Sequence, residues 1–227
     1  MIRLGAVGYL NARPLVFGLE ANPRFDVRYD IPSECARLLH AHEIDVGLIP
    51  SIEYLRGPHP YTFVAGPAVT SCGPVASVAI YTRREPRDIR TIAMDTSSRT
   101  SVALAEILLR RRFGIAPTSV PMPPDLDAML GRADAALIIG DTALFLDHAA
   151  AGVRKIDLGD AWTTMTGLPF VYAFWTGWPD AVSAEDAEAL ERARDAGARH
   201  ADEVAAAYYP DDVRRQAIAR GYLRDNI

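Results

Sequence analysis

The stretch Val7-Gly8-Tyr9-Leu10-Asn11-Ala12-Arg13-Pro14-Leu15 decides how the rest of the chain is interpreted. The apolar run at residues 2–7 predicts a buried strand, and apolar residues recur at helical spacing from Leu15 onward. The stretch therefore predicts a strand, a tight turn and the start of a helix. Ligands of open α/β sheets bind at the carboxyl ends of strands, where the amide of Asn11 would lie. The alternative is that Asn11 only caps the helix.

Other polar side chains stand at similar positions along the chain. Ser51 and Asp141 each follow a buried apolar strand, predicted at residues 44–49 and 133–139, and each precedes a helix. Ser77 lies inside a β-rich run, where its hydroxyl must bond to the backbone or point into a cleft. Helix capping is the local alternative for Ser51 and Asp141.

The segment at residues 95–101, Asp-Thr-Ser-Ser-Arg-Thr-Ser, is the strongest chemical signal. It follows a predicted strand and begins a helix, and the free N–H groups of a helix N-terminus attract anions. Hydroxyl donors at Ser98, Thr100 and Ser101 suit a carboxylate or a phosphate. One serine would suffice for a cap, so we favour an anion site over an over-supplied cap. The glycines and lysine of a nucleoside triphosphate loop are missing.

The composition is that of a soluble globular protein. The chain has 227 residues, is 49% hydrophobic and has a net charge of -5, which argues against a nucleic-acid partner. Cys35 and Cys72 form neither a disulfide framework nor a zinc spacing, and we expect no metal and no cofactor. No run approaches the roughly 20 apolar residues that span a bilayer, and the chain starts without a leader-like segment. We therefore expect a cytoplasmic protein without membrane contact; the sequence does not give its oligomeric state.

The β/α pattern pauses at two long β-rich runs, residues 75–82 and 168–176. If both cross between lobes, the chain forms two α/β lobes with a ligand cleft between them, as in hinged proteins that close on small ligands. Lobe 1 would contain residues 1–83 and 176–227, and lobe 2 residues 84–175. The side chains that would face this cleft are Asn11, Ser51, Ser77, Ser98, Thr100, Ser101 and Asp141.

Three further elements are predicted from local pattern. Residues 66–74, rich in Gly, Pro, Ser and Thr, predict a loop, and residues 162–167 predict an aromatic and threonine-rich loop. A long helix is expected from residue 183 to about residue 209.

An ordered set of motifs resembles the chorismate dehydratase of the futalosine route to menaquinone. The set is Gly8-Tyr9-Leu10-Asn11, Pro14-Leu15, Asp45-Val46-Gly47-Leu48-Ile49-Pro50-Ser51-Ile52-Glu53-Tyr54, Gly73-Pro74-Val75-Ala76-Ser77-Val78, Ser98-Arg99-Thr100-Ser101-Val102, Ile139-Gly140-Asp141 and Thr166-Gly167-Leu168-Pro169-Phe170-Val171. Each motif is weak alone, but their order is specific and spans nearly the whole chain. Members of that family continue with further helix past the point where this sequence stops.

This resemblance implies a type II periplasmic-binding-protein fold used as an enzyme. It implies dehydration of chorismate to 3-[(1-carboxyvinyl)oxy]benzoate, a hydro-lyase reaction. The matching motifs carry over Asn11 and Ser77 as active-site residues. Ser98, Thr100 and Ser101 match the serine/threonine segment that we assign to carboxylate binding, and we add Ser51 and Asp141 as substrate-binding candidates.

The predicted cleft is polar but poor in bases. The histidines fall on helices, helix ends or a loop away from the strand ends. A carboxylate at Asp141 would lie beside a dianion, which is unfavourable unless it is protonated. We therefore hypothesise that the substrate's own side-chain carboxylate accepts the ring proton, while Asn11 and Ser77 position the reacting groups.

Two other functions compete with this one. The first is dihydroxynaphthoate synthase, which acts later in the same pathway and shares the fold; the start at Tyr9-Leu10-Asn11 fits the dehydratase better. The second is a non-catalytic small-anion-binding or sensor protein. Apart from these functions, all the polar strand ends could be caps, which would make their predicted convergence a coincidence.

Overall fold

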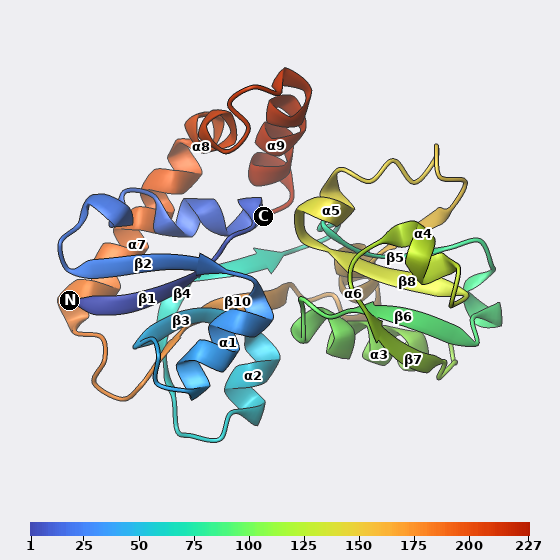
Figure 1. Cartoon of the computed structure of the whole chain (residues 1–227), viewed down its shortest axis with the longest axis horizontal. Helices are drawn as coiled ribbons and strands as arrows, with labels where there is room; N and C mark the ends of the chain where they lie inside the picture. Colours follow the sequence, from blue (N-terminus) through green and yellow to red (C-terminus); the bar gives the residue numbers. More distant parts are fainter. The chain divides into compact units, whose positions relative to one another are not determined.

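The computed structural model describes residues 1–227, which form two compact units (Figure 1). Unit 1 contains Met1–Thr70, Val171–Asp225 and Ile227, and unit 2 contains Ser71–Phe170 and Asn226. The chain thus passes between the units at 70/71 and 170/171, whereas we predicted 83/84 and 175/176.

Strand pairing explains the shifted boundaries. The strand β5 (Val78–Thr82), which we expected to cross between lobes, pairs with β8 (Ala135–Ile139) and β9 (Arg154–Asp157) and so lies wholly within unit 2. The strand β10 (Phe170–Gly177) pairs with β3 (Val46–Pro50) of unit 1 from Ala173 onward. The predicted crossing at residues 75–82 is therefore wrong in position, because the run contains a loop followed by a short strand of unit 2.

Unit 1 contains a five-stranded sheet in the order β2-β1-β3-β10-β4. The first strand is parallel to its two neighbours in the sheet, and β10 is antiparallel to β3. The central parallel strands are apolar and buried toward their carboxyl ends, as expected for strands covered on both faces. The remaining strands of the sheet are β1 (Ile2–Val7), β2 (Phe25–Asp30), β3 (Val46–Pro50) and β4 (Thr62–Ser71).

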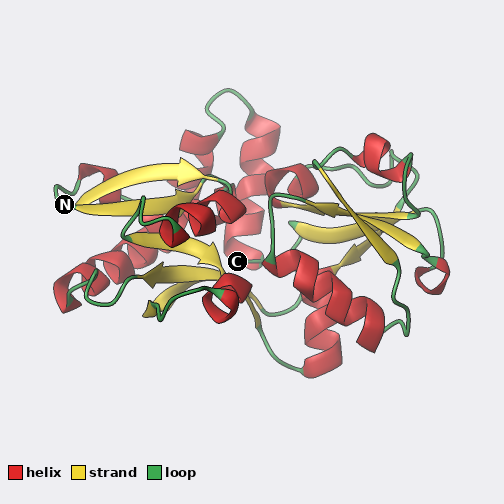
Figure 2. Ribbon diagram, turned by 60° about the horizontal axis from the view of Figure 1, so that its bottom comes forward, coloured by secondary structure: helices red, strands yellow, loops and turns green.

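Helices lie on both faces of this sheet (Figure 2). One helix, α1 (Pro32–His40), packs on β1 and β3 and buries Cys35. Another, α7 (Ala184–Arg199), packs on the 3-10 helix η1 (Leu10–Val16). The others in this unit are η2 (Leu19–Ala21), α2 (Ser51–Arg56), α8 (Ala201–Tyr208) and α9 (Val213–Asp225).

Unit 2 repeats the same plan of strands. Its sheet has the order β7-β6-β8-β5-β9, with β6 parallel to β7 and β8, and β5 antiparallel to β8. In both units a parallel trio is therefore followed by an antiparallel strand and then by a fifth strand. Besides β5, the strands of this sheet are β6 (Thr91–Asp95), β7 (Thr118–Met122), β8 (Ala135–Ile139) and β9 (Arg154–Asp157).

The core of unit 2 follows from alternation along its central strands. Ala79 and Tyr81 of β5 pack in one buried cluster with Ala136 and Ile138 of β8, and the residues between them point to the opposite face. Both faces are therefore apolar and covered. The helices of this unit are η3 (Pro86–Asp88), α3 (Thr100–Arg111), α4 (Leu126–Leu130), α5 (Gly140–Leu144) and α6 (Leu158–Thr166).

Three predicted elements differ from the structure. Residues 162–167, predicted as a loop, lie mostly in α6, which Asp157 caps at its N-terminus. The loop predicted at 66–74 is strand up to Ser71. The long helix expected over 183–209 is interrupted at His200, which separates α7 from α8. None of the helices is both long and apolar enough to cross a membrane.

Candidate active site

Asn11 stands in unit 1 directly beyond the carboxyl end of β1, as predicted. The strand ends at Val7, and the N–H of Gly8 then donates to the carbonyl oxygen of Asp30 at 2.9 Å, which holds the turn to the end of β2. The chain continues into η1, where Asn11 is the second residue and is half-buried. The expected α-helix is a 3-10 helix here, with Pro14 inside it.

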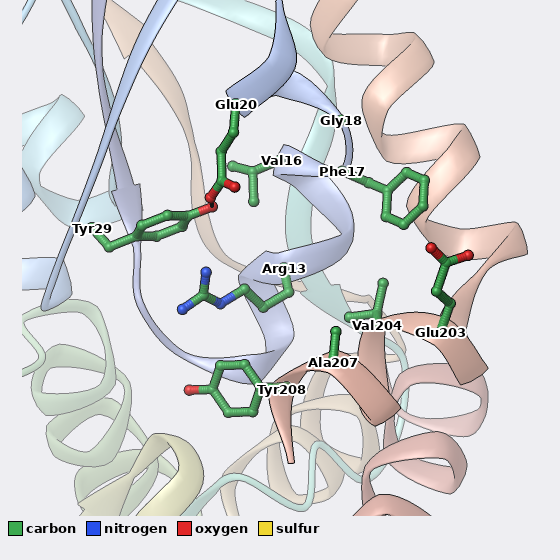
Figure 3. Close-up of a pocket in the computed structure, with 10 residues that line it drawn as sticks. All are labelled: Arg13, Val16, Phe17, Gly18, Glu20, Tyr29, Glu203, Val204, Ala207 and Tyr208. Carbon is green, nitrogen blue, oxygen red and sulfur yellow. Dashed lines mark hydrogen bonds between the residues drawn. The ribbon is translucent and has the colours of Figure 1, made fainter. Parts of the chain in front are cut away.

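The turn before Asn11 is also held from the C-terminal part of the chain. The hydroxyl of Tyr208 donates to the carbonyl oxygen of Gly8 at 2.8 Å, and the guanidinium of Arg13 donates to the same oxygen at 3.4 Å. That guanidinium lies 4.0 Å from the ring centre of Tyr29 and 5.0 Å from that of Tyr208 (Figure 3). Helix α8 therefore helps to fix the segment that carries Asn11.

A pocket opens beside this arrangement, with a volume of about 410 Å³ (Figure 3). Arg13, Tyr29 and Tyr208 line it together with Glu20, whose carboxylate accepts a hydrogen bond from the Tyr29 hydroxyl at 2.6 Å. Burial, reinforced by this bond to Glu20, raises the pKa of Tyr29 to about 12. The tyrosine therefore remains a neutral donor at physiological pH.

Close packing fixes η1 against α7. A Cβ built on Gly197 would lie 2.2 Å from the carbonyl oxygen and 2.4 Å from the Cα of Pro14, so only glycine fits there. The backbone of η1 consequently lies directly on the helix. This contact and the Tyr208 bond attach the Asn11 segment to two C-terminal helices.

Ser51 lies at the carboxyl end of β3, next to β1 in the same sheet, and begins α2. Its hydroxyl donates to the carbonyl oxygen of Val171 in β10 at 2.9 Å. The predicted position is confirmed, but at least one of its contacts is structural. Asn11 and Ser51 thus share one end of the unit 1 sheet.

Asp95, which we did not single out, organises the corresponding end of the sheet in unit 2. It is 1% exposed, and its Oδ1 accepts from the N–H and the hydroxyl of Ser97 at 2.9 and 2.6 Å. Its Oδ2 accepts from the N–H of Ile139 at 3.1 Å, which joins the ends of β6 and β8. Burial raises the pKa of Asp95, and the bonds from Ser97 and Ile139 oppose that rise.

The hydroxyl-rich segment lies where the sequence predicts it, at the start of α3. Ser98, Thr100 and Ser101 are all buried. The Oγ of Ser98 accepts from the N–H of Ser101 at 3.2 Å, which is the pattern of an N-cap. Capping therefore occupies Ser98 in part, as the local alternative predicted. The buried hydroxyl groups of Thr100 and Ser101 are not needed for that cap and still favour an anion site.

Ser77 and Asp141 lie at the same end of the unit 2 sheet. Ser77 directly precedes β5 and is 1% exposed, and its carbonyl oxygen accepts from the N–H of Gly140 at 2.8 Å. Asp141 follows Gly140 in α5 and is half-buried. The predicted candidates of unit 2 thus gather around the ends of β6 and β8 and the start of β5.

Two residues that support Ser77 were not predicted. Asp157 accepts hydrogen bonds from the backbone of Val75 and Ala76, and Lys155 donates to the carbonyl oxygen of Ala76. Both belong to β9, about 80 residues further along the chain. The sequence shows that Asp157 could cap the helix that follows it. It does not show that the same carboxylate also bonds to the backbone of Val75 and Ala76.

Comparison with known proteins adds to this geometry. A family model described as menaquinone biosynthesis matches residues 2–226. The chain belongs to the menaquinone biosynthesis family. This membership agrees with the resemblance carried by the ordered motifs.

Two relatives of this chain carry the name chorismate dehydratase. The one from Thermus thermophilus is 30% identical over 187 residues, which cover 76% of this chain and 68% of the relative. The one from Campylobacter jejuni is 28% identical over 165 residues, covering 73% of this chain and 58% of the relative. The matched regions thus span roughly two thirds or less of each relative's length.

The fold is that of type II periplasmic binding proteins. The periplasmic aliphatic sulphonate binding protein SsuA from Escherichia coli superposes with a TM-score of 0.62 at 16% identity, over 100% of this chain and 83% of that protein. At this identity the likeness concerns the fold alone. It confirms the predicted fold class and agrees with the strand order shared by the two units.

Proposed function

We propose that this chain is a chorismate dehydratase, which removes water from chorismate to give 3-[(1-carboxyvinyl)oxy]benzoate. The observation that carries the proposal is the 30% identity to the chorismate dehydratase of Thermus thermophilus, within a family match over residues 2–226. The reaction would be the first step of the futalosine-dependent route to menaquinone, and we propose that it takes place in the cytoplasm.

The active site in this proposal combines two sets of residues. Unit 1 supplies Asn11 and Ser51 from the ends of β1 and β3, and unit 2 supplies the groups around Ser77. We propose that both sets meet the same substrate molecule when the units close on it, as hinged binding proteins do. Closure would also exclude water from the reacting atoms.

The substrate-binding role falls mainly to the start of α3. Chorismate is a dianion, and one of its carboxylates would accept hydrogen bonds from Ser98, Thr100 and Ser101. The N-terminus of a twelve-residue helix favours negative charge at this position. Burial of these hydroxyl groups lowers the local dielectric and so strengthens each bond to an anion.

The reaction removes one ring proton and the neighbouring hydroxyl group, and aromatisation drives it. We propose that the substrate's side-chain carboxylate accepts the ring proton and passes it to the departing hydroxyl, which leaves as water. Asn11, with donor and acceptor atoms on one amide, would hold that carboxylate or the departing hydroxyl, and Ser77 would bond nearby. The protein's task is then mainly orientation.

Asp141 would bind substrate without acting as the base. An ionised carboxylate beside a dianion is electrostatically unfavourable, so a role as general base would need a compensating charge. A hydrogen bond to the substrate from the backbone beside Asp141 avoids that conflict. Replacing Asp141 therefore separates binding from proton transfer.

The test is product identification after incubation with chorismate. The proposal predicts a product lighter by one water molecule, with the proton spectrum of a substituted benzoate and an intact enolpyruvyl group. A non-catalytic binding protein would return unchanged chorismate. A dihydroxynaphthoate synthase would also leave chorismate unchanged, so recovery of intact substrate would reject the proposal.

A further inference from the structure

Asp157 connects two parts of unit 2 that are distant in the sequence. Its Oδ1 accepts from the N–H groups of Gly159 and Asp160 at 3.0 and 3.1 Å, which caps α6. The same oxygen accepts from the N–H of Val75 at 3.0 Å, and Oδ2 accepts from the N–H of Ala76 at 2.7 Å. One carboxylate therefore receives four backbone hydrogen bonds, two of them from the residues that immediately precede Ser77.

The backbone at Ala76 needs this support. Ala76 has φ +62°, in the left-handed region that a residue with a Cβ adopts at a cost. The turn continues through the N–H of Ser77, which donates to the carbonyl oxygen of Val75 at 2.7 Å. The carboxylate of Asp157 thus holds an unfavourable conformation that sets the direction in which Ser77 leaves the loop.

A cation bonds the next peptide unit, between Ala76 and Ser77. The Nζ of Lys155 donates to the carbonyl oxygen of Ala76 at 2.6 Å. Burial lowers the pKa of Lys155, and the charge of Asp157 opposes that shift, so the two residues of β9 support each other. The N–H and the carbonyl oxygen of Ala76 are therefore both hydrogen-bonded to side chains of β9.

Packing against α6 leaves the loop little freedom. A Cβ on Gly159 would lie 2.6 Å from the carbonyl oxygen of Gly73, and the N–H of Gly73 donates to Oγ1 of Thr163 at 2.9 Å. The segment from Gly73 to Ser77 is consequently fixed by β9 and α6 together. Local sequence around Ser77 does not encode this arrangement.

We propose that Asp157 is a positioning residue for the active site, which sets the conformation of the loop that presents Ser77. This inference rests on the role of Ser77 in the proposed function. Asp157 itself does not need to touch the substrate. The proposal assigns to it a contribution to turnover that is separate from its capping of α6.

The substitution Asp157→Asn separates those two roles. Asparagine is as good an N-cap as aspartate, and its single carbonyl oxygen can replace Oδ1, which serves three of the four donors. The amide nitrogen would then face the N–H of Ala76, donor against donor. The cap of α6 is kept, whereas the bond to Ala76 is lost.

The measurement is steady-state kinetics with chorismate, scaled to the folded fraction of each variant. Asp157→Asn should lower kcat on the order of tenfold or more, with a smaller change in KM, because misplacement of a reacting group costs rate. Asp125→Asn is the matched control, since Asp125 caps α4 of the same unit through Ala128. That control should leave kcat unchanged. An unchanged kcat in Asp157→Asn would overturn the proposal.

A second substitution tests whether Asp157 acts through the backbone conformation of Ala76. Glycine adopts positive φ without strain, so Ala76→Gly in the Asp157→Asn background should restore part of the lost kcat. Failure to restore any of it would contradict the claim that Asp157 acts through the conformation of Ala76.

Hydrogen exchange makes the test independent of the reaction. Peptides covering residues 73–77 should exchange faster in Asp157→Asn than in wild type, while those at the start of α6 keep their protection. Unchanged exchange at 73–77 would reject the positioning role even if the wild-type protein proved inactive on chorismate. An inactive wild type with faster loop exchange in the variant would instead reject the proposed function and keep the positioning role.

Discussion

The hydroxyl of Tyr208 donates to the carbonyl oxygen of Gly8 at 2.8 Å, although 200 residues separate them in the chain. Gly8 opens the turn that leads to Asn11, so the C-terminal helices contribute to the conformation of the first strand end. Both residues belong to unit 1. The contact makes the N-terminal motif dependent on α8.

Tyr208→Phe should lower kcat with chorismate on the order of tenfold, because the turn before Asn11 loses the shorter of the two side-chain bonds to the Gly8 carbonyl oxygen. The free energy of unfolding should fall by only about 1 kcal/mol, the usual worth of one hydrogen bond. Kinetics and urea denaturation of the same preparation check both values. Tyr54→Phe in α2 is the control, because the ring of Tyr54 packs on Phe63 and Phe174, away from Gly8. Equal kinetics for Tyr208→Phe and wild type would refute the anchoring role.

Gly197→Ala should destabilise unit 1 by about 2 kcal/mol or more, because the new methyl group would meet the backbone of Pro14 at 2.2 Å. Gly221→Ala in α9 is the matched control, since a Cβ there meets nothing within 4 Å. It should stabilise the protein by up to about 1 kcal/mol, the difference in helix propensity. Thermal denaturation of the pair should give shifts of opposite sign. A stabilised Gly197→Ala variant would contradict the close packing of η1 on α7.

The lowered pKa of Asp186 should make the free energy of unfolding depend on pH. Its hydrogen bond from Arg24 at 2.7 Å lowers its pKa from 3.8 to about 2, and the bonds from Ser183 add to this. A carboxyl whose folded pKa is lowered stabilises the fold above its unfolded pKa, and this stabilisation is lost as the pH falls toward 2. Asp186→Asn should therefore cost about 1 to 2 kcal/mol at neutral pH, a value reduced because Arg24 is partly exposed.

Denaturant titrations from neutral to acidic pH check this dependence. The difference between wild type and Asp186→Asn should shrink as the pH falls from about 4 toward 2. Asp195→Asn serves as the control, because Asp195 is exposed and its pairing with Arg194 lies on the surface. A difference that stays constant over the whole range would show that the charge of Asp186 is not what stabilises the fold.

Asp141→Asn distinguishes the two possible bases. If the substrate's carboxylate accepts the proton, this variant should change KM more than it lowers kcat. Loss of a general base would instead lower kcat on the order of a hundredfold or more, with binding unchanged. Substrate titration by calorimetry and steady-state kinetics separate these outcomes. The second result would reassign Asp141 as the base.

The strand ends were predictable because their pattern is local. The buried runs before Asn11, Ser51 and Asp141 end in the structure where their apolar residues end. The polar segment from Asp95 to Ser101 begins a helix for the same reason. Each of these features depends on neighbours a few residues away, which the sequence displays directly.

The supports of the candidate site were not predictable because they are long-range contacts. Asp157 reaches Val75 across 82 residues, and Tyr208 reaches Gly8 across 200. The former contact also explains why the run from 75 to 82 is not one strand: its first three residues form the bonded loop before β5. Likewise α6 forms where we predicted a loop, because Asp157 caps it and its small residues pack on the same loop.

The most direct measurement follows the ultraviolet spectrum of chorismate during incubation with wild-type protein and with Asn11→Ala. The proposed function predicts that wild type converts the diene absorbance into that of a benzoate. Asn11→Ala, folded by circular dichroism, should be slower by on the order of a hundredfold or more, as expected for loss of a preorganised hydrogen-bonding group. A spectrum that stays constant with folded wild-type protein, or equal rates for both proteins, would contradict the assignment.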